Sequence, residues 1–523
     1  MSTYERSIIS IIEPDYKGKI KLDEIFMEDS ESKEAQDKTS NALDSGLKSS
    51  DFKTSSKAGA FVPVLFLNSM KFQEDEIQKM EMSLEYRVPT ISLTIKDTDN
   101  KFSTSAPIDG DVLSLYLRPP DVDNQKPIRI DFNIQSVYSN PTTRVYNIGG
   151  IMKIPEFNRE LSKSFPEATS FDHLGDVCEE VGLGFASNEE STDDSMTRIC
   201  GWETYSNFVG DVVFTAYKDD DSFFDWYIDP YYYLCFVNVN KQFSLEDKTE
   251  DVNIHPSVPT TATQGNGEEK EGNKGSLILT NQTQLSGKNV YIEKYSLKNM
   301  AGEVWLNNGY KRYGQWLNIG ESELEFQEAF TDPLTTPGAE KDFILLKGRK
   351  SDGDFYKTQS KYTWLGKQAS LTEKGNVHDN YCFSKIHNHQ NLQEIDKTTL
   401  EIEISGMNFY LYKYMRIPVN IYQSGNPKAA DAIKGRNIAI GETNDNSEDA
   451  KNTPMAKLTG EREDDPIDPS GTPASQDQIK NEYLSGYYVI KSLTYSYKPG
   501  GPIMTRATLS RREWPIPAST KDS

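Results

Sequence analysis

Cysteine and histidine are scarce in this sequence. Four Cys and five His occur among 523 residues. No two Cys form a CxxC pair, so their spacing predicts neither a zinc framework nor a disulfide pattern. Buried free thiols are the default for such residues, which is compatible with a reducing cytosol. This expectation covers Cys178, Cys200, Cys235 and Cys382.

Positive charge and long apolar runs are also lacking. The chain has 57 Lys and Arg against 80 Asp and Glu, a formal net charge of -23. Such a chain will not coat nucleic-acid phosphates, but its charge suits a wall that DNA passes without sticking, or simply solubility. No apolar run approaches ~18 residues, so we expect no membrane-spanning segment. Met1–Arg6 also lacks the basic segment of a signal peptide.

Catalytic motifs are absent too. No Walker loop, GxSxG, HExxH or GxGxxG stands in a suitable strand and helix context. The densest carboxylate cluster is Asp219–Asp221, with Asp225 and Asp229 close by in the sequence. Paired carboxylates could serve glycoside hydrolysis. Consecutive Asp residues in a helix-to-strand turn splay apart, however, which favours a solvated turn. We therefore assign no catalytic residue.

The sequence predicts neither a metal nor a cofactor. Asp97–Lys101 begins like a calcium loop, but Lys101 stands where a third oxygen ligand belongs, so a strand-end turn is favoured. Asp445–Asp449 is incomplete in the same way and lies in a linker. The one His/Cys cluster lacks the tight pairs of a zinc site and is interpreted as an Asn/His-rich loop. Its members are His378, Cys382, His387 and His389.

Three further residues or motifs carry no site either. His173 is expected on the polar side of a helix, and His255 in a linker. Asn281–Thr283 matches a glycosylation acceptor, but no secretory signal supports it.

The chain does contain many aromatic residues, 28 Tyr and 23 Phe, although its hydrophobic content is only 36%. Folded β units that alternate with polar insertions reconcile these facts. Three polar stretches lack the apolar content that would offset ordering entropy, so they are predicted to be mobile loops or linkers. They are Glu28–Ser56, Val252–Ser276 and Gly441–Lys480.

Two stretches predict β units. In the first, Ile91, Leu93 and Ile95 alternate with polar residues, the period of a sheet with one buried face. Its expected strands are Val62–Asn68, Glu81–Val88, Thr90–Lys96, Asp111–Arg118, Ile128–Tyr138 and Thr143–Ile154. The second unit begins with alternating Leu400, Ile402 and Ile404, continues through Tyr412–Tyr422 and ends in a hairpin around Lys498–Pro502. This hairpin is similar to the earlier one at 132–151, which indicates two related units.

The segment between them predicts a mixed α/β module. Ser170 is expected to cap a helix that ends at Gly182. A second helix is predicted over Tyr205–Tyr217, followed by an aromatic strand pair, Phe223–Ile228 and Tyr232–Val237. Residues 277–392 are predicted to be mostly strands and turns, including Val290–Tyr295 and a turn at Asn308-Gly309.

In this order, the segments resemble the baseplate central hub protein of contractile-tailed bacteriophages of the T4 type. The resemblance is carried by Pro89–Asn100, Gly110–Leu115, Phe132–Tyr138, Ser170–Leu174, Glu180–Phe185, Trp202–Tyr217 and Gly486–Ile490. It implies a mainly β fold with α+β character: two tail-tube-like β-barrel domains, an inserted α/β module and long polar insertions. The implied division is an N-terminal arm and polar loop (1–59), a first barrel (60–155), the α/β module (156–250), a linker (251–276), a β-rich insertion domain (277–395) and a second barrel (396–523) with a disordered insertion at 441–480.

The resemblance also implies a structural, non-enzymatic role. Three subunits would form a pseudo-sixfold ring that joins the hexameric tail tube to the trimeric central spike and lets DNA pass. The implied partners are the tail tube protein, the central spike protein, baseplate wedge proteins, and a tape-measure protein or DNA in the lumen. The implied place is the tail baseplate of the virion, assembled in the host cytoplasm. A carbohydrate-binding or carbohydrate-cleaving tail protein is the alternative, with the aromatic strands at 223–236 stacking on sugar rings.

Overall fold

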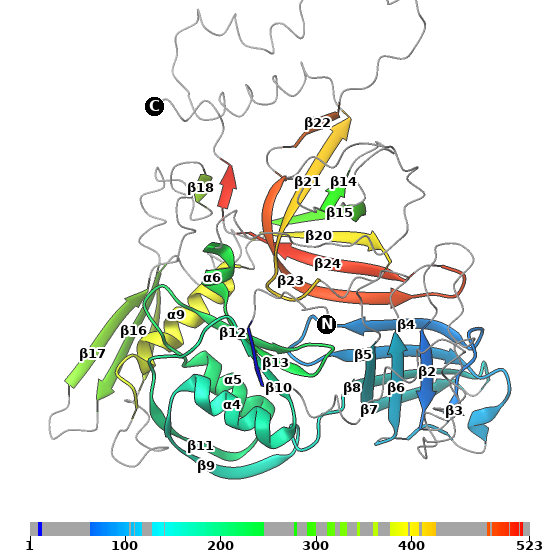
Figure 1. Ribbon diagram of the computed structural model, residues 1–523, viewed down its shortest axis with the longest axis horizontal. Helices are drawn as coiled ribbons and strands as arrows, with labels where there is room; N and C mark the ends of the chain where they lie inside the picture. Colours follow the sequence, from blue (N-terminus) through cyan, green and yellow to red (C-terminus); the bar gives the residue numbers. More distant parts are fainter. Residues whose placement is uncertain are drawn as a thin grey trace, which may run out of the picture.

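The computed structural model describes an N-terminal strand, most of residues 63–244 and a set of strands and helices after 277 (Figure 1). The described residues are 9–12; 63–244 without 69, 104–105, 109, 118–127 and 141; and 277–279, 290–299, 311–318, 325–331, 343–345, 359–364, 377–395, 398–406, 411–424, 478–481, 484–501, 503–511 and 513–515. The polar stretches at 28–56 and 252–276, and most of the third, lie outside them, as do Val304, Asn308 and Gly309.

One 14-stranded sheet runs through both predicted β units. Its order is β22-β21-β14-β15-β20-β24-β23-β4-β5-β8-β7-β6-β2-β3. The first β unit contains β2 (Val64–Leu67), β3 (Met70–Lys71), β4 (Ile77–Ser83), β5 (Thr90–Lys96), β6 (Val112–Leu117), β7 (Ile128–Asn140) and β8 (Val145–Met152). The second β unit contains β14 (Leu277–Leu279), β15 (Val290–Asn299), β20 (Thr398–Ser405), β21 (Arg416–Ser424), β22 (Gln478–Lys480), β23 (Gly486–Tyr497) and β24 (Met504–Ser510). The two halves meet where β23 pairs with β4.

Six strands of the second β unit form a closed ring. Strand β21 pairs with β23 on one side and with β14 on the other, and β14, β15, β20, β24 and β23 follow one another by hydrogen bonding. The alternating side chains of β20 and β21 fill the interior, as the period-2 pattern predicts. These fully buried residues are Leu400, Ile402, Ile404, Ile417, Val419 and Ile421.

The first β unit has the same strand order in a more open form. In chain order, β2, β4, β5, β6, β7 and β8 correspond to β14, β15, β20, β21, β23 and β24, and corresponding strands have corresponding neighbours. Among the described strands, the first unit is not closed between β2 and β4; it curls so that β4 and β5 run across the direction of β2 and β6 (Figure 1). The two units differ in the direction of one strand pair: β2 is antiparallel to β6, whereas β14 is parallel to β21.

Two bulges fall at equivalent places in the two units. Gln78 is the extra residue of β4 opposite β5, and Glu293 is the extra residue of β15 opposite β20. Gln135 is the extra residue of β7 opposite β8, and Lys491 is the extra residue of β23 opposite β24. A bulge changes the register and twist of a pair in a specific position. The shared bulges confirm that the early and terminal hairpins are equivalent.

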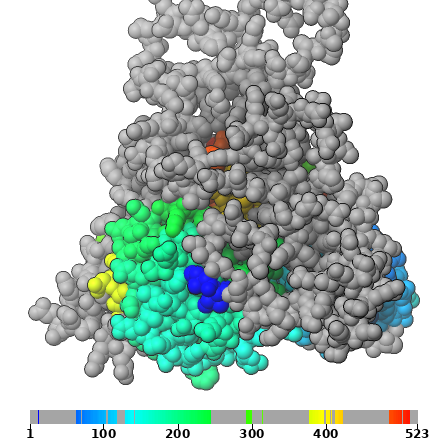
Figure 2. Space-filling model, in the orientation of Figure 1, coloured from blue at the N-terminus to red at the C-terminus, as the bar shows by residue number. Residues whose placement is uncertain are grey.

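The α/β module contains a four-stranded sheet, order β1-β10-β13-β12, and a β9–β11 ribbon. Its elements are β1 (Ile9–Ile12), β9 (Glu160–Ala168), α4 (Ser170–Val181), β10 (Gly184–Ser187), β11 (Met196–Thr204), α5 (Tyr205–Phe214), β12 (Phe224–Ile228), β13 (Tyr233–Asn238) and α6 (Val239–Ser244). The predicted aromatic strand pair is confirmed as β12 and β13. Strand β1, dark blue in Figure 2, lies on the module's surface, so part of the expected N-terminal arm belongs to this sheet.

The ends of α4 are set by local capping. The N-cap is Thr169, one residue before the predicted Ser170, because Thr169 and Asp172 form a reciprocal capping box. Ser170 is instead the first helical residue, and its buried hydroxyl accepts a hydrogen bond from Arg198. Gly182 ends the helix at φ 74, a left-handed conformation that favours glycine.

The expected insertion domain at 277–395 does not stay apart from the second β unit. Strands β14 and β15 lie within that range but complete the six-stranded ring. The range also contains a three-stranded sheet of β16 (Lys311–Asn318), β17 (Glu325–Thr331) and β19 (Gln359–Trp364). Strand β18 (Phe343–Leu345) pairs instead with β25 (Glu513–Pro515).

A helix, α9 (Tyr381–Glu394), lies where the sequence predicted a loop. Its buried face carries polar side chains such as Asn388, Gln390 and Asn391, so it shows no hydrophobic period. Asn388 explains how such a face is stable. Its Oδ1 accepts from Phe224 N at 3.2 Å, and its Nδ2 donates to the carbonyls of Phe214 and Ala216.

Candidate functional site

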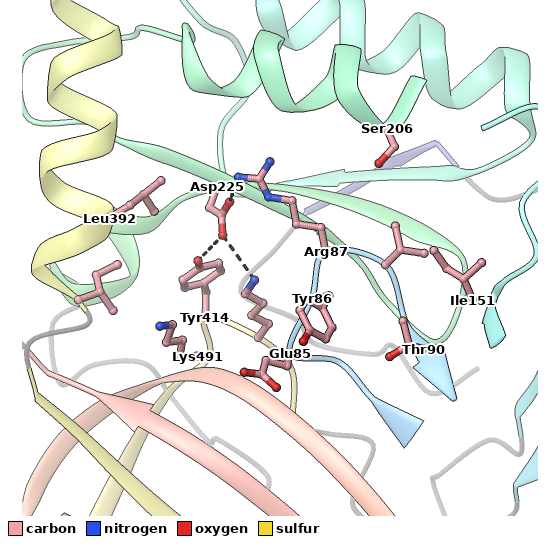
Figure 3. A pocket seen from close by; sticks show the side chains of 13 residues that line it. Glu85, Tyr86, Arg87, Thr90, Ile151, Ser206, Asp225, Leu392, Tyr414 and Lys491 are labelled. Atoms are coloured by element: carbon pink, nitrogen blue, oxygen red, sulfur yellow. Dashed lines mark hydrogen bonds and ion pairs between the residues drawn. The ribbon is translucent and has the colours of Figure 1, made fainter. Parts of the chain in front are cut away.

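Asp225 stands where three segments distant in sequence meet (Figure 3). It lies on β12 of the α/β module and is buried. Arg87, from the loop after β4, approaches its Oδ1 at 3.4 Å, and Lys413, just before β21, approaches its Oδ2 at 3.5 Å. Tyr414 donates its hydroxyl to the same Oδ2. One carboxylate thus joins the module to both β units.

Arg87 holds this junction in several ways. Its carbonyl accepts a hydrogen bond from Ile228 N at 2.7 Å, and its guanidinium lies 5.3 Å from the Trp226 ring centroid. This explains why the predicted strand at 81–88 is wrong at its end: β4 stops at Ser83, and the chain leaves the sheet to reach β12.

The electrostatics of the junction favour an ionised Asp225. Burial opposes ionisation, but Lys413, Arg87 and the Tyr414 hydroxyl outweigh it and hold the pKa of Asp225 below its usual value. A carboxylate bound to two cations and a hydroxyl is not free to act as a proton donor or nucleophile. Its geometry suits a structural link.

A pocket of about 600 Å³ opens beside this junction. Lys491, the extra residue of the β23 bulge, also lines it, as expected of a bulge that redirects a side chain. Tyr86, 65% exposed, stands at its rim. Other lining residues are Glu85, Val88, Thr90, Ile151, Ser206, Leu392 and Ile395. The pocket therefore lies at the boundary of all three units.

The other carboxylates of the predicted cluster do not join Asp225. Asp219, Asp220 and Asp221 are exposed and occupy the turn between α5 and β12, as predicted. Asp220 accepts a hydrogen bond from the Tyr217 hydroxyl, and Asp219 Oδ1 accepts one from Asp221 N within the turn. Asp229 is buried, and its Oδ1 accepts from the backbone N–H groups of Tyr231 and Tyr233 in the hairpin turn.

The aromatic strands offer no sugar-stacking surface. Every residue of β12 and β13 is buried. Trp226 is 1% exposed, and the Phe224 and Phe236 rings stack on each other at 4.8 Å. These side chains form the core of the module rather than a binding face.

The predicted His/Cys cluster is spread over different contacts. His378 Nε2 lies 3.0 Å from Thr215 O, and the His387 ring stacks on Phe383. Cys382 is buried near Met196 and Val377. Within the described residues, no three His, Cys, Asp or Glu side chains come together as a metal site would require.

The prediction that His173 lies on the polar side of its helix is wrong. The structure buries it completely, with Nε2 3.0 Å from Met196 O and the ring against Phe165. The β9–β11 ribbon covers this second face of α4, which a single helical period does not reveal. Burial lowers the pKa of His173.

The remaining predictions concern turns and thiols. Asp97 accepts from the backbone N–H groups of Lys101 and Phe102, which confirms the strand-end turn. All four Cys are buried free thiols, as predicted, and burial raises the pKa of Cys200 to about 11. The segments with His255, Asn281–Thr283 and Asp445–Asp449 lie outside the described residues. In the part of the chain that is described, no helix has the length and apolar character to cross a membrane.

The sequence predicted no role for four residues that hold these contacts: Arg87, Lys413, Tyr414 and Asn388. Nothing local distinguishes these residues, because each acts through a contact far along the chain; Tyr414 and Asp225 are 189 residues apart.

No protein-family model matches the sequence, and no curated protein matches it. Similar solved structures include the 43 kDa tail protein of prophage MuSo2 from Shewanella oneidensis, 11% identical, covering 86% of this chain and 98% of that chain with a TM-score of 0.44. A tail protein from Neisseria meningitidis is 7% identical, with coverage of 86% and 97% and a TM-score of 0.43. The E. coli c3393 protein, a type VI secretion component described as similar to T4 tail proteins gp27 and gp5, is 9% identical, with coverage of 85% and 74% and a TM-score of 0.33.

Proposed function

We propose that this chain is a structural hub of a contractile tail, in which three copies form a ring of six β units between the tail tube and the central spike. The supporting observation is the internal repeat: two units with one strand order and two bulges at equivalent positions. A trimer of such a chain offers six similar surfaces to a sixfold tube, while keeping threefold symmetry for a spike.

The same proposal covers domains, partners and place. The β unit at 60–155 and the β unit at 396–523, which β14 and β15 complete, would build the ring. The module at 156–250 and the sheet of β16, β17 and β19 would lie outside it. Tail tube, spike and wedge proteins would bind the ring, and a tape-measure protein or DNA would pass through it. The net charge of -23 supports passage without tight phosphate binding. The chain would be assembled in the host cytoplasm and reside in the tail baseplate.

A catalytic role is not part of this proposal. Asp225 is bound by cations, and the aromatic strands form a buried core, so neither feature supports the carbohydrate-active alternative.

Light scattering of the purified chain, alone and with candidate spike and tube proteins, tests the proposal. A mass of three chains, and a ring with a central opening in negative-stain images, is expected. A chain that stays monomeric with both partners present, or a solid particle without an opening, would contradict it.

A further inference from the structure

The pairing of β23 with β4 shows how one β unit joins the next within the chain. One edge of β23 pairs with β24. The other edge pairs first with β21 at 486–489 and then with β4 at 494–497. Thr494 lies opposite Ser83, Tyr495 opposite Met82 and Ser496 opposite Glu81. The backbone pairing continues beyond β4, where Leu84 N donates to Leu493 O at 2.8 Å.

The internal repeat assigns equivalents to both partners. Matching the bulges of β7 and β23 makes Tyr138 equivalent to Thr494, and Ser139 to Tyr495. Matching the bulges of β15 and β4 makes Leu297 equivalent to Met82, and Lys298 to Ser83. An edge like that of β23 is therefore present on β7, and an edge like that of β4 is present on β15.

Neither of these edges is covered by another strand among the described residues. The edge of β7 that faces away from β8 pairs with β6 only as far as Asn133. The edge of β15 that faces away from β20 pairs with β14 only as far as Tyr291. Tyr138 is 70% exposed and Leu297 43% exposed, whereas Met82, the internal equivalent of Leu297, is fully buried.

We infer that β7 of one copy pairs antiparallel with β15 of a second copy, with Tyr138 opposite Lys298, Ser139 opposite Leu297 and Asn140 opposite Ser296. This inference rests on the proposed ring and specifies its interface between subunits. The contact is head-to-tail, since it joins two different edges, and repetition of such a contact closes a ring when the rotation permits. Each contact would extend the sheet across the subunit boundary, as β-strand addition does.

The opposed side chains are compatible with this register. They carry one positive charge, on Lys298, and no negative charge, so no like charges face each other. Exposed strand edges of this kind favour pairing with another chain unless they are covered.

Disulfide trapping tests the register. Because Leu84 and Leu493 form a hydrogen-bonded pair, Thr494 and Ser83 form the closer, non-hydrogen-bonded kind, with Cα atoms about 4.5 Å apart. The equivalent pair across copies is Tyr138 and Lys298, and this separation suits a disulfide. The double variant Tyr138→Cys/Lys298→Cys should, after oxidation, give covalent dimers and trimers on a denaturing gel without reductant. The four native Cys are buried and should not contribute.

The control is Tyr138→Cys/Ser296→Cys, which places the two thiols out of register. At least a tenfold lower cross-linked fraction is expected. A folding defect caused by Tyr138→Cys would appear in both variants, and light scattering of each reports the oligomeric state separately. A trimer in which the in-register pair cross-links no better than the control overturns the strand pairing and leaves the proposed hub standing. A chain that stays monomeric with tube and spike proteins overturns both.

Discussion

Asp225 shows how a single buried side chain can hold three units together. Replacing it with Ala leaves Lys413 buried without its counter-charge and removes the acceptor of the Tyr414 hydroxyl. Breaking a buried ion pair on one side commonly costs about 3–5 kcal/mol. We therefore expect Asp225→Ala to lower the free energy of unfolding by roughly 3 kcal/mol in chemical denaturation.

Asp220→Ala is the matched control for this change. Asp220 is exposed in the neighbouring turn, so its loss should change the free energy of unfolding by about 0.5 kcal/mol or less. Equal effects of the two substitutions would show that the Asp225 junction has no special structural weight.

His387 gives the chain a pH dependence. Burial lowers its pKa to about 4, against an unperturbed value near 6.5. Between these values, only the unfolded chain takes up the proton, so the free energy of unfolding should fall as the pH drops from 6.5 to 4, by up to about 3 kcal/mol. Thermal unfolding at pH 7.5 and pH 5 measures this loss.

His387→Gln should reduce that pH dependence, because Gln does not titrate. His389→Gln changes a half-buried residue of the same helix and should preserve it. An unchanged slope in His387→Gln would show that the loss of stability comes from other groups.

At the scale of elements, α9 depends on Asn388, because much of its buried face is polar. Asn388→Ala would leave Phe224 N and two carbonyls without their buried partner. Each unsatisfied buried group costs about 1–3 kcal/mol, so the three together should lower the free energy of unfolding by at least about 3 kcal/mol. Hydrogen exchange should show faster exchange at Phe224 N. Lys385→Ala, on the same helix, should cost about 1 kcal/mol or less; an equal loss there would contradict the role of Asn388.

At the scale of the whole molecule, Leu297 should matter for assembly and not for folding. It is 43% exposed in one copy and would be buried against β7 of the next. Leu297→Ser should therefore weaken each subunit contact by about 1.5 kcal/mol, roughly tenfold in affinity, while the melting temperature of the monomer stays within a few degrees.

Ile199→Ser is the corresponding control on another surface. Ile199 is 39% exposed on β11, away from both open edges, so this change should leave the trimer intact in sedimentation experiments. A stable trimer of Leu297→Ser would argue against β15 as the contact.

Most strands could be predicted because their signals are local. The alternation at 91–95 and 400–404, the turn at 498–502 and the aromatic hairpin at 223–237 each contain their own pattern, and the structure follows them. Helix α9 could not be predicted in this way, since its buried face mixes polar and apolar residues without a helical period, and the hydrogen-bond partners of Asn388 come from β12 and the end of α5. The Asp225 junction could not be predicted either, because the residues that contact Asp225 come from both β units.

The sequence by itself determined where strands and turns form, and that two hairpins far apart are alike, because side-chain period and turn residues act over a few positions. Only the tertiary structure decided that the two units share one sheet, that β14 and β21 close the six-stranded ring of the second unit, and that parts of β7 and β15 have no partner strand among the described residues. Strand neighbours and register depend on long-range hydrogen bonding, which short patterns such as Ile77-Gln-Lys79 and Ile292-Glu-Lys294 do not specify until the chain folds.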